Sequence, residues 1–272
     1  MPSSFPVLFV GDVVGTPGME AVAAFLPSLI KRYGAACVIL NGENAMDGKS
    51  ITETQVARLK DLGVHVITSG NHIWENWHIQ KLLADEPFLL RPFNYPRENP
   101  GRGFCTVNLG ALGKVGVINL QGRVFMSPID CPFHAAETAL QKLNEECRVI
   151  LVDFHAEATA EKIALGVFLD GKVSAVIGTH THVQTADARI FPGGTAYITD
   201  VGMTGPYDSV VGMRKEVALR RFMRQTPSKF EPATDDVHLA AVVVTVDAVS
   251  GKALSIEPII YPEFSRHVGN HS

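Results

Sequence analysis

Five short polar segments of this sequence hold residue types that bind metal ions, and each one directly follows an apolar run. The segments are Gly11-Asp12, Asn41-Gly42-Glu43-Asn44, Gly70-Asn71-His72, His155 and Gly178-Thr179-His180-Thr181-His182. Carboxylates, carboxamide oxygens and imidazoles all coordinate cations, and a mixed nitrogen and oxygen set suits manganese, iron or zinc better than calcium or magnesium. The segments predict a site for two metal ions, with the ligands Asp12, Glu43, Asn44, Asn71, His155, His180 and His182.

The segment His180-Thr181-His182 is the sharpest local indication of such a site. In an extended segment, residues two apart share one face. We therefore expect the imidazoles of His180 and His182 to point the same way and to bind a pair of cations.

Each segment alone also has an ordinary structural interpretation. Asp12 could cap a helix or stabilise a turn, and Glu43 could be a solvated residue after an Asn-Gly turn. His155 could be a hydrogen-bonded structural residue. The joint occurrence of the segments indicates the metal site. His72 would lie next to the metals without binding one, and this suits a general acid because imidazole titrates near neutral pH.

Buried strands and amphipathic helices alternate through the first two thirds of the chain. Strands are predicted at 7–10, 37–40, 64–68, 104–109, 115–120, 149–154 and 175–178, and helices at 17–33, 52–62, 76–83, 132–146 and 159–169. Thr52 and Gln55 form a plausible capping box. Strand, helix and strand at this spacing predict parallel pairing, which gathers the polar segments at the carboxyl ends of the strands.

The pattern changes after residue 188. Mostly antiparallel strands are predicted at 188–191, 195–199, 239–246 and 253–261, with one helix at 215–224, a polar loop at 227–236 and a frayed tail at 267–272. No repeat or linker divides the chain. We predict a single α/β domain over residues 1–272, in which two mixed sheets pack face to face with helices outside.

Composition narrows the functional classes. The 272 residues are 46% hydrophobic and carry a net charge of −4, which gives no support to a nucleic-acid-binding surface. The sequence has no run of about 18 apolar residues that could span a membrane, and its N-terminus lacks the features of a signal peptide. Four widely spaced cysteines without a CxxC pair predict reduced thiols and a cytoplasmic protein.

The order of the polar segments resembles that of the calcineurin-like metallophosphoesterases, whose pattern runs GDxH, GDxxD, GNH(D/E), a lone His and GHxH. This chain follows that order from residue 11 to residue 182 with departures: Val14 stands at the position of the first histidine, and Glu43 replaces the bridging aspartate. The strings GDVVG, NGEN, GNHIW and GTHTHV, with the segment Asn119-Leu120-Gln121-Gly122-Arg123, resemble one branch, the bacterial 2′,3′-cyclic-nucleotide 2′-phosphodiesterases.

The resemblance implies a four-layer α/β/β/α sandwich and two metal ions, iron or manganese before zinc. Asp12, Glu43, Asn44 and His182 would hold one ion, and Glu43, Asn71, His155 and His180 the other. A hydroxide that bridges the metals would attack phosphorus, and His72 would protonate the departing ribose oxygen. The expected substrate is a small phosphodiester, a 2′,3′-cyclic nucleotide that would yield a 3′-nucleotide, and the family often self-associates as a homo-oligomer.

Other interpretations of the sequence remain open. The same residues could serve a phosphomonoesterase, a 3′,5′-cyclic nucleotide phosphodiesterase or a low-turnover regulator that senses nucleotides. Arg91 and Arg123 could contact phosphate or base, although solvated surface roles are favoured. Trp74 and Trp77 could stack on a base, but a role in core or helix packing is at least as well supported.

Overall fold

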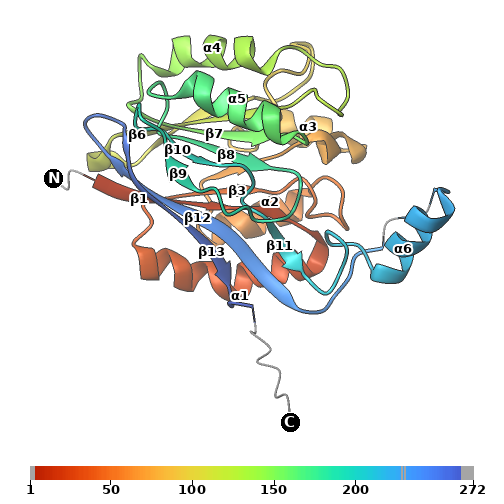
Figure 1. The fold of residues 1–272 in the computed structure, drawn as a ribbon. Coiled ribbons are helices and arrows are strands. Elements are labelled where there is room, and N and C mark those ends of the chain that lie inside the picture. Colours follow the sequence, from red (N-terminus) through yellow and green to blue (C-terminus); the bar gives the residue numbers. More distant parts are fainter. Residues whose placement is uncertain (1–3, 228, 230, 265–272) are drawn as a thin grey trace.

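Two β-sheets lie face to face in the computed structural model and carry helices on their outer surfaces (Figure 1). The structure describes residues 4–264 apart from 228 and 230, so the tail predicted at 267–272 lies outside the described residues, as does part of the loop predicted at 227–236.

The first sheet has seven strands and combines the beginning of the chain with its end. Its order is β2-β11-β12-β1-β3-β4, and β13 pairs with β12. The strands are β1 (Ser4–Val10), β2 (Asp12–Val13), β3 (Cys37–Asn41), β4 (Val66–Thr68), β11 (Met203–Pro206), β12 (Val237–Asp247) and β13 (Ala253–Tyr261). β1, β3 and β4 are parallel, as predicted, and β12 runs antiparallel to β1.

The second sheet has six strands in the order β5-β6-β7-β8-β10-β9. They are β5 (Phe104–Asn108), β6 (Lys114–Gln121), β7 (Val149–His155), β8 (Ala175–Thr179), β9 (Arg189–Ile190) and β10 (Ala196–Ile198). β6, β7, β8 and β10 are parallel. The parallel pairing of β10 with β8 differs from the mostly antiparallel arrangement predicted after residue 188.

Three apolar cores separate four layers. One core packs the outer face of the first sheet against α1 (Gly15–Tyr33), α2 (Glu53–Asp61) and α3 (Ile79–Asp85). The second lies between the sheets and combines residues of both, including Phe9 and Leu151. The third packs the second sheet against α4 (Pro132–Leu143) and α5 (Thr159–Leu169). The predicted α/β/β/α sandwich is therefore confirmed.

Local chemistry explains where several elements begin. The Thr52 side chain accepts from the Gln55 backbone N–H while the Gln55 side chain accepts from the Thr52 N–H, which confirms the predicted capping box. α1 begins at Gly15, two residues before Pro17. A short 3₁₀ helix, η1 (Asn71–Glu75), occupies the predicted turn after β4 and delays the start of α3 to Ile79. A second one, η2 (Gly110–Leu112), joins β5 to β6.

The structure also bears on the predictions about membrane spans, cysteines and strands. In the described part of the chain, no helix is both long enough and apolar enough to cross a membrane. All four cysteines are free thiols, as predicted. β11 escaped prediction because its four residues, Met-Thr-Gly-Pro, show no alternation and contain both Gly and Pro.

Gly178 allows β8 to lie against the end of β10. A Cβ added at Gly178 would lie 1.7 Å from the carbonyl oxygen of Thr199, a backbone atom that cannot move aside. Close packing against the backbone therefore requires glycine directly before the segment that carries His180 and His182.

Replacing Gly178 by Ala should destabilise the fold near the upper end of the roughly 1–3 kcal/mol that overpacking costs. Denaturation in urea measures the change in unfolding free energy. Gly116→Ala in β6 is the matched control, because its Cβ would approach only side chains, Ile150 and Leu143, at 3.3 Å. An equal loss in the two variants would contradict the argument.

Candidate metal centre

The carboxyl ends of parallel strands from both sheets meet at one edge of the sandwich. Buried hydrogen bonds join the sheets there. The Asn41 side chain donates to the Asp153 carboxylate at 2.9 Å. Asn119 accepts from the backbone N–H of Ser69 and donates to its carbonyl oxygen, at 2.9 and 2.8 Å. The role of Asn119 is therefore to connect the sheets, which the sequence alone did not indicate.

The structure places the seven predicted ligands at this edge. Asp12, Glu43 and His155 are fully buried, Asn44 is 3% exposed, and Asn71, His180 and His182 are half-buried. The acceptor atoms of Glu43, His155 and His180 lie within 4.8 Å of one another, an arrangement that could hold a metal ion.

Hydrogen bonds to the protein select one ring nitrogen of each histidine for the centre. Nδ1 of His155 lies 2.9 Å from Thr179 Oγ1, which itself donates to Asp153. Nε2 of His180 lies 3.0 Å from the Glu157 carboxylate, and Nδ1 of His182 lies 3.0 Å from the carbonyl oxygen of Val211. These acceptors hold the ring proton on the outer nitrogen and leave the inner nitrogen as a potential ligand.

Glu43 lies between two groups of these side chains. Its Oε1 is 3.0 Å from His155 Nε2 and 3.1 Å from Asn44 Nδ2. His155 Nε2 is also 3.0 Å from His180 Nδ1, so a carboxylate oxygen and two ring nitrogens converge on one point.

A second group surrounds His182 Nε2, which lies 3.2 Å from Asn44 Nδ2 and 3.7 Å from Asp12 Oδ2. The Asn44 amide presents its nitrogen to Glu43 and His182. Coordination by its oxygen, as predicted, requires the amide to turn by half a rotation, which exchanges two groups of nearly equal size.

Two buried oxygens test whether this site fits a metal. Asp12 Oδ1 and Asn71 Oδ1 have no hydrogen-bond partner. A buried unpaired acceptor is costly, and each of these oxygens would gain a partner from a bound cation. The observation fits two metal ions held by the predicted residues. Gly70 contributes space, because a Cβ there would lie 2.1 Å from the His155 ring and 2.4 Å from Glu43 Oε2.

The backbone that carries the two histidines is not extended, so the expected geometry of His180 and His182 is wrong. Their φ angles are 101° and 66°, in the left-handed region that non-glycine residues rarely adopt. The imidazoles consequently reach different groups, His180 beside His155 and His182 beside Asn44.

A buried ion pair fixes this segment. One oxygen of the Asp200 carboxylate accepts from Thr181 N–H at 3.0 Å, Thr181 Oγ1 at 2.7 Å and Lys162 Nζ at 2.8 Å. Lys162 Nζ also donates to the Thr179 carbonyl oxygen at 2.8 Å. Lys162 and Asp200 were not predicted to lie in the site. A lysine in a helix ordinarily has a solvated side chain, so the sequence gives no sign of this buried pair.

Charge coupling shifts the pKa values of the buried groups. Burial alone would raise the pKa of Glu43, but the charge and hydrogen bond of His155 lower it to about 2. Burial alone would lower the pKa of His155, but Glu43 and Asp12 raise it to about 9. Burial and the positive charge of His155 lower the pKa of His180 to about 3. Burial raises the pKa of Asp12 well above its usual value.

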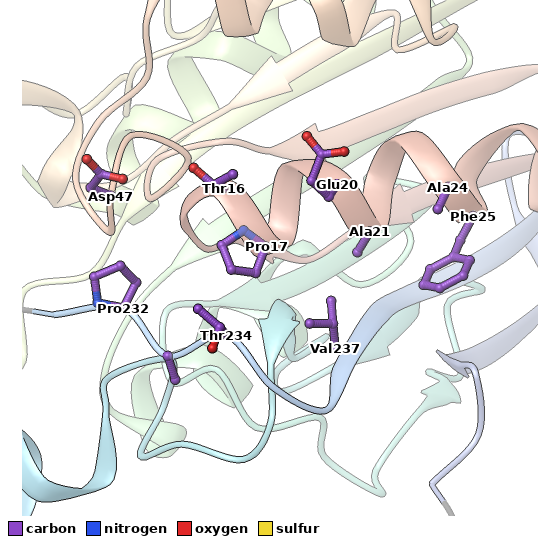
Figure 2. A pocket seen from close by; sticks show the side chains of 11 residues that line it. Thr16, Pro17, Glu20, Ala21, Ala24, Phe25, Asp47, Pro232, Thr234 and Val237 are labelled. Carbon is purple, nitrogen blue, oxygen red and sulfur yellow. The ribbon is translucent and has the colours of Figure 1, made fainter.

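A cavity of about 920 Å³ opens onto the centre. Glu43, Asn44, His180 and His182 line it, and so does His72. The backbone N–H of His72 donates to Glu43 at 3.2 Å, and its ring Nδ1 bonds to Glu75, which also pairs with Lys49. The neighbouring hollow of about 540 Å³ beside α1 contains no histidine (Figure 2). Candidate metal-binding residues therefore line the cavity of about 920 Å³ and not this hollow.

The other residues considered for substrate contact do not line the cavity. Arg91 is only 4% exposed and donates to the carbonyl oxygens of three residues in its loop, so its predicted surface or phosphate role is wrong. Arg123 is exposed and lies near Cys131. Trp74 packs against the first core, and Trp77 is 96% exposed.

Two residues of α6 (Lys215–Arg224), Arg221 and Phe222, line the cavity although no motif singled them out. One indication of such a role is present in the sequence. This ten-residue helix carries four cationic side chains together with the large apolar residues Leu219, Phe222 and Met223.

Comparisons with known proteins agree with this architecture. The YmdB-like protein family matches residues 8–259. A 2′,3′-cyclic-nucleotide 2′-phosphodiesterase of Bacillus subtilis (strain 168) is 48% identical over 255 residues, which cover 93% of this chain and 96% of that protein. The crystal structure of a hypothetical protein from Thermus thermophilus aligns with a TM-score of 0.88 and 40% identity, over 94% of this chain and 99% of that one. A novel phosphatase from Mycoplasma pneumoniae aligns with a TM-score of 0.90 and 36% identity, over 96% of this chain and 94% of that one.

Replacing Asp200 by Asn would leave the Lys162 ammonium buried without its counter-charge. We expect the unfolding free energy to fall by roughly 3–5 kcal/mol in denaturant titrations, the usual effect of breaking a buried pair. Asp208→Asn breaks the exposed pair with Lys215 and should have little effect, since these side chains are 51% and 48% exposed. Similar losses in both variants would show that the buried pair does not hold the segment.

Metal binding should release protons. With a pKa of about 9, His155 is protonated at pH 7 in the metal-free protein, but a ligand histidine must be neutral. The apparent Kd for Mn²⁺ should therefore fall roughly tenfold for each pH unit between pH 6 and 8. Calorimetry in buffers of different ionisation enthalpy counts the protons, and a count of zero or a net uptake would refute the role of His155.

Proposed function

The chain belongs to the YmdB-like protein family, and we propose that it is a metal-dependent phosphodiesterase that hydrolyses 2′,3′-cyclic nucleotides to 3′-nucleotides. Its resemblance to the metallophosphoesterases, predicted from the sequence, is confirmed by the family match and by the 48% identical Bacillus subtilis 2′,3′-cyclic-nucleotide 2′-phosphodiesterase. The chain is therefore an enzyme of the metallophosphoesterase type, and the nature of its substrate is the proposed part.

One observation supports the metal requirement most strongly. Three histidines with fixed ring protons and two unpartnered buried oxygens surround the Glu43 carboxylate. Asp12, Glu43, Asn44 and His182 would hold one ion, and Glu43, Asn71, His155 and His180 the other, with iron or manganese ahead of zinc. Two such cations neutralise the charge of a phosphoryl group and lower the pKa of a bound water.

His72 is the proposed proton donor. Its backbone is tied to Glu43 and its ring to Glu75, so the imidazole is oriented at the rim of the cavity. Water adds its oxygen to phosphorus and releases one proton to solvent, while the bond between phosphorus and the 2′ oxygen breaks. His72 gives its proton to that oxygen, which leaves a 2′ hydroxyl and a 3′-phosphate.

The proposed function is that of a single-domain protein in the cytoplasm. The apolar core shared by the two sheets supports a single domain over 1–272, and the free thiols support a reducing cytoplasmic location. The partner is a small phosphodiester. The Mycoplasma pneumoniae phosphatase with the same fold makes phosphomonoesters the second candidate substrate.

Assays with 2′,3′-cyclic AMP, 3′,5′-cyclic AMP and 4-nitrophenyl phosphate in the presence of Mn²⁺ test the proposed reaction. The 2′,3′-cyclic substrate should show the highest kcat/KM and give only the 3′-nucleotide. Faster release of phosphate from the monoester would favour the second candidate instead.

Replacing His72 by Gln should lower kcat by about 10²–10⁴ because the leaving oxygen loses its proton donor. Elemental analysis should find the same metal content as in the wild type. His134→Gln changes a histidine that does not line the cavity and should retain full activity. Full activity of the His72 variant, or loss of its metal, would contradict the assigned role.

A further inference from the structure

α6 stands apart from the sandwich at the side of the molecule (Figure 1). It packs through Val217 and Ala218 onto Met213, in a small cluster separate from the three cores. Its apolar residues Leu219, Phe222 and Met223 remain 56%, 68% and 83% exposed. Single exposed apolar side chains are ordinary, but several together on one weakly attached helix mark a surface that takes a ligand or a partner.

Among the exposed apolar side chains of α6, Phe222 is the one that lies in the cavity of the candidate metal centre. Phe222 and the adjacent Arg221 line the same cavity as Glu43, His180 and His182, whereas Met223 does not. Phe222 is the one benzene ring among the described residues that line this cavity. An exposed aromatic ring beside a phosphate site is the arrangement that stacks on a nucleobase.

Charge assigns a role to Arg221. Two lysines also line the cavity: Lys49 pairs with Glu75, and Lys229 lies outside α6. Arg221 makes no ion pair with any residue in the described ranges. Its guanidinium is therefore available to an anionic ligand in a cavity whose floor is formed by Glu43 and the histidines.

We propose that α6 is the nucleotide-recognition element of this site, in which Phe222 stacks on the base and Arg221 pairs with the phosphate. The proposal rests on the proposed function and narrows its substrate class. The protein selects phosphodiesters that carry a nucleobase over base-free cyclic phosphodiesters of the same ring size. The selection operates through a helix that contributes no metal ligand.

The test compares 2′,3′-cyclic AMP with glycerol 1,2-cyclic phosphate, which has the same five-membered phosphodiester ring but no base. Phe222→Ala should raise KM for the nucleotide about tenfold and leave kcat/KM for the glycerol compound unchanged. Arg221→Gln should lower kcat/KM about tenfold for both substrates, since both carry the phosphate. Met223→Ala and Arg220→Gln are the matched controls on the same helix and should match the wild type.

Equilibrium binding provides a readout that does not depend on turnover. Calorimetry with metal-loaded protein should show that Phe222→Ala weakens binding of 3′-AMP about tenfold and leaves binding of glycerol 2-phosphate unchanged. If wild-type protein binds the two ligands equally, or if Phe222→Ala affects both equally, the inference is overturned. Inactivity of the wild type toward both diesters would instead overturn the proposed function, and the binding result would still decide the inference.

Discussion

The Asp200 carboxylate holds the segment of His180 and His182 in a backbone conformation that these residues do not adopt by themselves. It accepts hydrogen bonds from the backbone and the hydroxyl of Thr181, and Lys162 neutralises it from α5. Strained backbone persists only where the surroundings determine it strongly. The buried pair of Lys162 and Asp200 fixes the strained backbone. It thereby allows two histidines separated by one residue to reach separate points beside Glu43.

Near the candidate metal centre, buried hydrogen bonds as well as apolar contacts hold the two sheets together. Asn41 and Asp153 join the sheets at the edge of the candidate metal centre, and Asn119 joins them beside Ser69. Thr179 then connects Asp153 to His155. Buried networks of this kind stabilise a structure only when each member has its partners. The unpartnered oxygens of Asp12 and Asn71 are exceptions, and they lie where cations would bind.

The sequence predicted the layers and the place of the site well, because both depend on local patterns. Apolar runs followed by polar residues located strand ends, and parallel pairing brought these ends together. Helix 159–169 and strand 253–261 were predicted with the bounds that the structure shows. β11 and the orientation of β10 were missed, because short strands that contain Gly or Pro give no periodic signal.

The site was predicted in composition but not in geometry. All seven proposed ligands lie at one edge, whereas the backbone of His180 and His182 and the orientation of the Asn44 amide differ from expectation. The pairing of Lys162 with Asp200 and the place of Phe222 in the cavity depend on residues far apart in the sequence. Such contacts follow from the tertiary fold, and no spacing rule reveals them.

The small contact area between α6 and the rest of the protein has an evolutionary consequence. Because only Val217 and Ala218 of this helix are buried, its remaining side chains can change with little effect on folding. The histidines of the candidate metal centre have no such freedom, since His155, His180 and His182 are each tied to a second residue. Sequence drift in this chain is therefore expected to gather in one peripheral helix, while the candidate metal centre stays as it is.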